Sequence, residues 1–158
     1  MKKVAIFASG SGTNAENIAR YFAANQQIEV SLLVSNNPKA GVHARMAGLG
    51  IPAVTFSKQA FVEGIPILKK LREYPVDWIV LAGFMTKIPV EILNAYPNRI
   101  VNIHPALLPK YGGKGMYGMH VHEAVVAAGE KESGITVHYV NGEYDEGRVI
   151  FRASCPVL

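Results

Sequence analysis

The feature that most constrains the fold is a regular alternation of two kinds of segment over the first two thirds of the chain. Short apolar runs rich in β-branched residues, typical of buried strands, alternate with stretches in which apolar residues recur at helical spacing. The strand-like runs are residues 4–7, 28–34, 78–81 and 100–103, and the helix-like stretches are residues 14–24, 42–49, 61–74 (with Pro66 as a possible start) and 90–96. This order favours parallel strands joined by right-handed helical crossovers, with helices on both faces of the sheet. The sequence therefore predicts an α/β fold in three layers, with a doubly wound, mostly parallel, Rossmann-like sheet.

The pattern changes in the last third of the chain. Residues 104–121 contain four glycines and two prolines and have no apolar periodicity, so we expect a long loop, a kind of segment that is often functional. A short helix over residues 123–128 then leads to two strand-like runs, residues 134–140 and 149–156, on either side of a polar turn. These runs predict a C-terminal β-hairpin. We expect residues 1–158 to form a single domain.

The composition narrows the class of protein. The chain has 158 residues, of which 49% are hydrophobic, about the size of one domain. Its apolar runs are far shorter than the roughly 20 residues that span a bilayer, and its first residues lack a secretory signal, so we expect a cytoplasmic protein. The net charge is +4, but the basic residues are scattered, which argues against a nucleic-acid surface. The single cysteine, Cys155, can form no internal disulfide, and we expect it to be a small core residue.

A glycine-rich segment, SGSGTN at residues 9–14, lies between the first predicted strand and the first predicted helix. Gly10 and Gly12 let the backbone turn tightly, and the amide groups and dipole at a helix start favour an anion such as phosphate. The segment lacks the third glycine of the dinucleotide fingerprint and the Gly-Lys-Ser/Thr of the Walker loop. Two interpretations stay open: an anion site, which we favour, and a helix cap in which a serine or threonine bonds the first-turn amides.

The segment Asn102-Ile103-His104-Pro105 lies at the carboxyl end of the fourth predicted strand, where open α/β sheets place their ligands. Alternate side chains of a strand share a face, so Asn102 and His104 should point the same way, with Ile103 opposite. An amide and an imidazole would then converge beside the long loop. We interpret this pair as functional.

Two further polar clusters are less informative. Residues 143–147 (EYDEG) put three carboxylates in the predicted turn of the hairpin, where solvation alone would explain them. His120 and His122 would share a face if extended, but no cysteine or glutamate completes a zinc pattern with them and His104. We therefore expect no metal site.

Several motifs, in order along the whole chain, resemble the folate-dependent phosphoribosylglycinamide formyltransferases of purine biosynthesis. The motifs are SGSGTN at 9–14, LAGFM at 81–85, NIHPALLPKYGG at 102–113, HVHEAV at 120–125, and SGITVHYV at 133–140 followed by YDEG. The resemblance implies transfer of a formyl group from the co-substrate 10-formyltetrahydrofolate to the primary amine of glycinamide ribonucleotide. The implied partners are these small molecules, with no nucleic acid or membrane, and the implied state is a monomer or homodimer.

The resemblance also implies a role for each matching position. The implied sets are Asn102, His104 and Asp145 for catalysis; Gly12, Thr13 and Asn14 for the substrate phosphate; Met85 and Pro105 for the ribonucleotide; and Met85, Thr86, Lys87, Ile88, Val140, Asn141 and Asp145 for the folate. The chemistry fits these residue types. When an amine attacks a formyl carbon, negative charge develops on the formyl oxygen and positive charge on nitrogen, so a site needs hydrogen-bond donors and a proton acceptor. Asn102 and His104 would be the donors, and Asp145 would favour the imidazolium form of His104 or accept the proton of the amine.

The sequence departs from the family pattern at three places. Thr86 replaces the arginine that many members carry directly after the methionine, and the loop at residues 113–118 is longer than usual. The chain stops at Leu158, so we expect it to lack the family's C-terminal helical segment, whose lysine and glutamate help bind the ribonucleotide. The alternatives that we weigh are methionyl-tRNA formyltransferase and formyltetrahydrofolate hydrolase, which normally add a second domain, and an inactive module that binds nucleotide or folate.

Overall fold

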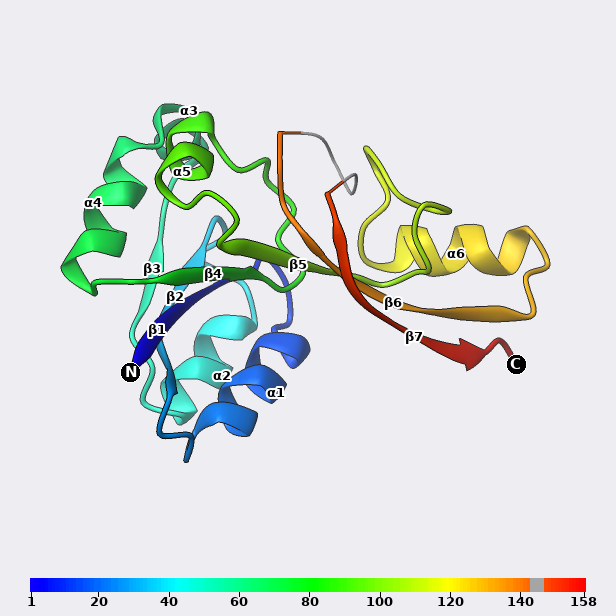
Figure 1. Cartoon of the computed structure of the whole chain (residues 1–158), viewed down its shortest axis with the longest axis horizontal. Helices are drawn as coiled ribbons and strands as arrows, with labels where there is room; N and C mark the ends of the chain where they lie inside the picture. Colours follow the sequence, from blue (N-terminus) through cyan, green and yellow to red (C-terminus); the bar gives the residue numbers. More distant parts are fainter. Residues whose placement is uncertain (143–146) are drawn as a thin grey trace. The chain divides into compact units, whose positions relative to one another are not determined.

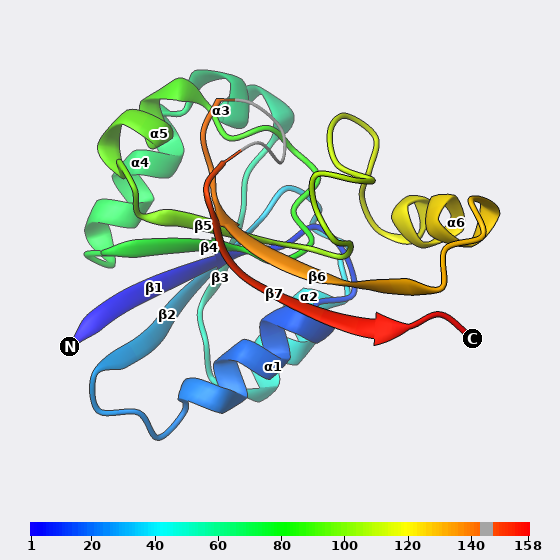
Figure 2. The same ribbon diagram turned by 45° about the vertical axis from the view of Figure 1, so that its right-hand side comes forward.

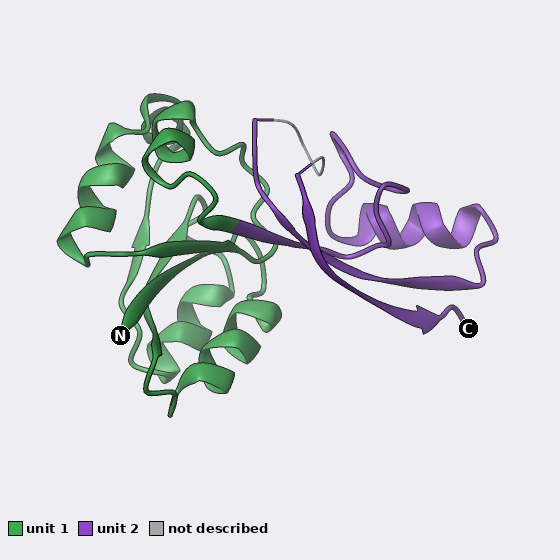
Figure 3. Cartoon of the chain, in the orientation of Figure 1, with its two compact units in different colours: residues 1–100 green, residues 101–158 purple. Residues whose placement is uncertain are grey.

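The computed structural model of the chain describes residues 1–142 and 147–158. The chain forms two compact units, Met1–Ile100 and Val101–Leu158 (Figure 3). The seven strands hydrogen-bond in the order β3-β2-β1-β4-β5-β6-β7. The predicted α/β fold is confirmed, with a mostly parallel first part and an antiparallel C-terminal hairpin.

The first unit holds a parallel sheet built on a strand that is buried on both faces. Its strands are β1 (Lys2–Phe7), β2 (Ile28–Ser35), β3 (Ala53–Thr55) and β4 (Trp78–Leu81). Strand β1 pairs in parallel with β2 and with β4, and β2 pairs in parallel with β3. The side chains of Ala5, Ile6 and Phe7 are fully buried, as expected of a central strand covered by helices on both sides.

Two groups of helices supply that cover in the first unit. Figures 1 and 2 show α1 and α2 together on one face of the sheet, and α3, α4 and α5 together on the other. The helices are α1 (Thr13–Phe22), α2 (Val42–Gly48), α3 (Lys58–Glu63), α4 (Ile65–Glu73) and α5 (Val90–Ala95). Because strand side chains alternate, Ile6 packs with Ala15 and Met46 in one layer, while Phe7 meets the ring of Phe61 in the other. The doubly wound arrangement is therefore confirmed.

The sequence prediction was wrong in detail at two places in this unit. The predicted helix over residues 61–74 is two helices, because α3 begins earlier, where Ser57 accepts a hydrogen bond from the amide of Ala60, and ends at Gly64, whose φ is 77°. The second helix, α4, begins at Ile65, beside the start at Pro66 that the sequence also indicated, and carries Pro66 in its first turn, where a missing amide proton costs nothing. Strand β3 was missed because three residues are too few to show a period.

The second unit holds the antiparallel part of the sheet. Strand β5 (Ile100–His104) has its first residue in the first unit; β6 (Glu132–Tyr139) pairs antiparallel with β5 and with β7 (Val149–Pro156). The predicted hairpin is confirmed. The long loop after His104 ends at helix α6 (Met119–Ala127), which begins four residues before the predicted start. The loop and α6 lie on the same side of the β6–β7 hairpin (Figures 1 and 2).

The prediction that Cys155 is a core residue was wrong. Cys155 is exposed on β7, the last strand in the hydrogen-bonding order. A strand at the edge of a sheet has a neighbour on one side only, so a small apolar residue there need not be enclosed. Within the part of the chain that the structure describes, every helix is too short or too polar to cross a bilayer.

Candidate active site

The centre of the candidate site is a polar face on strands β5 and β6 of the second unit. The antiparallel register sets Asn102 opposite His138 and His104 opposite Thr136, while Ile103 lies opposite Val137. Since alternate residues of a strand share a face, these four polar residues lie on one side of the two strands. Thr136, His104 and His138 are at most 2% exposed. Buried polar groups of this kind must be hydrogen-bonded, and the bonds determine what each group can do.

The ring of His104 is fixed by a backbone carbonyl. Its Nε2 atom lies 2.7 Å from the carbonyl oxygen of Tyr111, in the loop that follows β5. A peptide carbonyl can only accept a hydrogen bond, so the Nε2 atom of His104 carries a proton. The carbonyl of Tyr111 therefore fixes the orientation of the His104 ring.

A second histidine fixes the amide of Asn102. The Nδ1 atom of His138 lies 3.0 Å from the carbonyl oxygen of Tyr139, which requires a proton on Nδ1. In the neutral ring, Nε2 of His138 accepts, and it lies 3.0 Å from Nδ2 of Asn102. The amide nitrogen of Asn102 therefore donates to His138, and with two protons it can also donate to a second acceptor.

Thr136 holds the start of the loop after His104. Its hydroxyl donates to the carbonyl oxygen of Ala106 at 2.7 Å and accepts from the amide of Leu108 at 3.0 Å. The peptide bond between Leu108 and Pro109 is cis. Sequence reasoning assigned no role to Thr136, His138 or Tyr111. The available signal was the alternation of polar Thr136 and His138 with apolar Ile135 and Val137.

The glycine-rich loop of the first unit leads into helix α1. Gly12 is the N-cap of α1 with φ 80°, and no side chain among residues 1–142 and 147–158 caps the helix. The cap interpretation, in which a serine or threonine bonds the first-turn amides, is therefore wrong. A Cβ at position 12 would collide with the side chain of Val42, so both the backbone angle and the space require glycine. The amide of Val42 donates to the carbonyl of Gly10 at 3.1 Å and holds the turn from the other side.

Arg45 of α2 clamps the same loop onto α1. Its Nε donates to the carbonyl oxygen of Ser11 at 2.8 Å, and its Nη1 donates to Glu16 at 2.9 Å. Glu16 also pairs with Arg20, at 3.1 Å. The hydrogen bond from Arg45, followed by that from Arg20, holds the pKa of the Glu16 carboxyl below its usual value. This carboxyl therefore stays ionised at neutral pH and keeps its ion pairs with Arg45 and Arg20.

The segment after β4 is joined directly to the glycine-rich loop. The amide of Met85 donates to Oγ of Ser9 at 2.9 Å, and the amide of Ser9 donates to the carbonyl of Gly83 at 3.1 Å. Asn36 donates to the hydroxyl of Thr86 at 2.6 Å. Met85 is 48% exposed. The first unit thus brings the predicted phosphate residues and the predicted ribonucleotide residue Met85 together.

The other predicted site residues fall in four places. Lys87 is exposed and Ile88 is buried, in the segment after Met85. Pro105 directly follows β5 and is partly buried. Val140 and Asn141 directly follow β6, the first partly buried and the second exposed. Asp145 lies outside the described residues. Among residues 1–142 and 147–158, no group of three or more histidine, cysteine or acidic side chains is placed to hold a metal ion.

Comparison with known proteins gives this arrangement a family. Residues 2–158 match the family model described as formyl transferase. The phosphoribosylglycinamide formyltransferase of Bacillus subtilis is 40% identical over 157 residues, which cover 95% of this chain and 77% of the relative. The crystal structure of glycinamide ribonucleotide transformylase 1 from Geobacillus kaustophilus superposes with a TM-score of 0.89 at 39% identity, covering all of this chain and 84% of that one. The chain therefore belongs to the formyl transferase family, as its motifs predicted.

Other relatives are considerably longer than this chain. The chloroplastic phosphoribosylglycinamide formyltransferase of Arabidopsis thaliana is 42% identical over 163 residues, which cover 99% of this chain and 56% of the relative. The corresponding protein of Vigna unguiculata is covered to 52%. The chain thus spans about half the length of these plant relatives.

Proposed function

We propose that the chain transfers a formyl group from 10-formyltetrahydrofolate to the primary amine of glycinamide ribonucleotide. The observation that carries this proposal is the pairing of Asn102 and His104 on one face of β5, each fixed by a part-buried hydrogen bond. The similarity to bacterial enzymes named for this reaction also supports the proposal: the chain is 40% identical to the Bacillus subtilis relative and 39% identical to the Geobacillus kaustophilus one.

The proposed reaction is a direct attack of the amine nitrogen on the formyl carbon. A bond forms between these two atoms, and the formyl oxygen becomes an oxyanion in a tetrahedral intermediate. Asn102 and His104 donate hydrogen bonds to that oxyanion. The bond to N10 of the folate then breaks, N10 takes up a proton, and the amine nitrogen loses one. Asp145 is the proposed acceptor of the proton from the amine, directly or through water.

The hydrogen bonds of the second unit decide which protons serve the oxyanion. The Nε2 proton of His104 is held by Tyr111, so His104 donates to the oxyanion through Nδ1, in the doubly protonated ring. Asn102 donates with the amide proton that His138 does not hold. Neither group forms a covalent intermediate, and both are set in place before the substrate arrives, which is the arrangement that stabilises developing charge most effectively.

The first unit supplies the proposed phosphate site. The amides of Gly12, Thr13 and Asn14 lie at the start of α1, where the helix dipole attracts an anion and no side-chain cap competes for the amides. Met85, tied to this loop through Ser9, is the proposed contact of the ribonucleotide, with Pro105. The proposed folate contacts are the residues Met85, Thr86, Lys87, Ile88, Val140, Asn141 and Asp145.

The test compares three acceptors with one donor. The protein is incubated with 10-formyltetrahydrofolate and with glycinamide ribonucleotide, charged initiator tRNA or water alone, and the formylated products are measured. We expect formyl glycinamide ribonucleotide. Formylated tRNA or free formate as the main product would replace the proposal with one of the other reactions of the fold, and binding of both ligands without turnover would mark an inactive module.

A further inference from the structure

The loop after β5 reaches His104 through one residue with an uncommon backbone conformation. Tyr111 has φ 57°, in the left-handed region that residues with a side chain seldom adopt. This conformation aims its carbonyl oxygen at Nε2 of His104, 2.7 Å away. This backbone conformation costs free energy for a tyrosine, so another contact must stabilise it.

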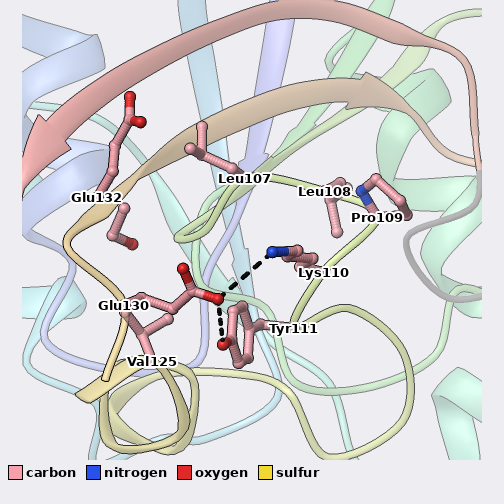
Figure 4. A pocket seen from close by; sticks show the side chains of 9 residues that line it. Leu107, Leu108, Pro109, Lys110, Tyr111, Val125, Glu130 and Glu132 are labelled. Carbon is pink, nitrogen blue, oxygen red and sulfur yellow. Dashed lines mark hydrogen bonds and ion pairs between the residues drawn. The ribbon is translucent and has the colours of Figure 1, made fainter. Parts of the chain in front are cut away.

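Glu130, which follows α6, holds the side chain of Tyr111. The hydroxyl of Tyr111 donates to Oε1 of Glu130 at 3.0 Å, as Figure 4 shows. Burial, followed by this hydrogen bond to Glu130, raises the pKa of the Tyr111 hydroxyl, so the hydroxyl remains a donor at neutral pH. A second donor, Lys110, reaches the same oxygen at 3.4 Å, but its side chain is 71% exposed. The tyrosine is therefore the better-ordered partner of Glu130.

These contacts form one wall of a pocket of about 320 Å³ in the second unit (Figure 4). Its apolar lining includes Leu107, Leu108 and Val125, and its polar wall is the Glu130 cluster. The Glu130 oxygen that faces Lys110 and Tyr111 already receives both of their donors. We therefore interpret the polar wall as a support for the loop.

We propose that Tyr111 and Glu130 are positioning residues, which orient the ring of His104 by holding its Nε2 proton. This inference rests on the proposed function. The path runs from Glu130 to the hydroxyl of Tyr111, and from the carbonyl of Tyr111 to His104. Without the anchor, Tyr111 leaves the left-handed conformation, its carbonyl turns away, and the ring of His104 loses the acceptor that orients it.

Two substitutions break the path at its anchor and leave the carbonyl in the chain. Tyr111→Phe removes the hydroxyl, and Glu130→Ala removes the acceptor. For each, we expect kcat for formyl transfer to glycinamide ribonucleotide to fall by about tenfold, because loss of orientation at a reacting group has costs of this order or larger. The KM values of both substrates should change by less than about twofold, since neither residue is proposed to touch a substrate. The double variant should be no worse than either single variant.

Two matched variants separate positioning from general support of the loop. Glu130→Gln keeps an oxygen that accepts from Tyr111, so its kcat should stay close to that of the original protein. Lys110→Met removes the other contact of Glu130 and should also keep its kcat, because an exposed ion pair contributes little.

The ring nitrogens of His104 give a readout that does not depend on activity. Long-range ¹H–¹⁵N spectra of the protein without substrates report the hydrogen bond of the Nε2–H group. We expect the same hydrogen-bonded Nε2–H signal in the original protein, Glu130→Gln and Lys110→Met, and a shifted or broadened Nε2–H signal in Tyr111→Phe and Glu130→Ala. Unchanged ring signals in these last two variants, while circular dichroism shows them folded, would overturn the inference. If the original protein makes no formylated product, the proposed function fails and these spectra alone decide the inference.

Discussion

The two candidate binding regions are built in different ways. In the first unit, the proposed phosphate loop uses backbone amides at a helix start, shaped by Gly12 and clamped by Arg45. In the second unit, the proposed catalytic face uses the side chains Asn102 and His104, each fixed by a group distant in the sequence or in a loop. The first region presents backbone amides, and the second presents side chains that other residues hold in place. Substitutions should therefore affect binding in the first and turnover in the second.

The largest expected effect is on turnover in the second unit. His104→Ala removes one donor to the oxyanion, a loss that costs about 3 to 4 kcal/mol, so kcat should fall by roughly a hundredfold or more. Steady-state kinetics with 10-formyltetrahydrofolate and glycinamide ribonucleotide measure it. The KM for the ribonucleotide should change little. A variant with near-normal kcat would remove His104 from the chemistry.

The next largest effect is on the phosphate loop. Gly12→Ala places a Cβ against Val42 at a residue with φ 80°, so we expect a loss of unfolding free energy of about 1–3 kcal/mol. The KM for glycinamide ribonucleotide should rise more than kcat falls. Denaturant unfolding and kinetics measure the two effects. Gly10→Ala is the matched control, because a Cβ there meets nothing within 4 Å, and equal effects of the two substitutions would contradict a requirement specific to position 12.

A third substitution tests whether the loop after His104 is held by Thr136. Thr136→Val keeps the shape of the side chain but leaves the amide of Leu108 and the carbonyl of Ala106 without this buried partner. We expect a loss of about 1–3 kcal/mol in unfolding free energy. Thr55→Val is the control, because Thr55 is exposed on β3 and should change stability by less than about 0.5 kcal/mol. Similar losses in both proteins would argue against a special role for Thr136.

The smallest effect is the pH dependence of the Arg45 clamp. The pKa of Glu16 is lowered in the folded protein, so its contribution to stability is complete above the ordinary value of 4.5 and is lost as the pH falls through the folded value. Glu16→Gln cannot be ionised and should lose less stability over that acidic range than the original protein does. Thermal unfolding at a series of pH values compares them. Parallel curves below pH 4.5 would show that the clamp adds nothing.

The fold was predictable from the sequence because its signals are local. The alternation of apolar runs with helical spacing gave the strands of the first unit, and the Asn102-Ile103-His104 segment marked one end of the sheet. The short strand β3 and the separate helix α3 were missed, since a few residues carry no period. Cys155 was misplaced because residue type alone does not tell an edge strand from a central one.

The candidate site was only partly predictable for a related reason. Asn102 and His104 are neighbours in the chain, so the period of a strand was enough to place them on one face. His138 comes opposite Asn102 only through the register of β5 and β6, which depends on the whole hairpin. Tyr111 contacts His104 through its backbone carbonyl. The residue type gives no sign of the left-handed conformation that this contact needs. The alternation in β6 marks the face of His138, but the residue types alone do not mark its contact with Asn102.

The most direct test of direct transfer at Asn102 and His104 is a ¹³C NMR time course with a donor labelled at its formyl carbon. With glycinamide ribonucleotide in the sample, the formyl signal should move from the folate to the formamide of the product, without labelled formate accumulating. The same sample with His104→Ala should show this movement slowed by roughly a hundredfold or more. Label that collects as formate, or an equal rate in the two proteins, would contradict formyl transfer at this centre.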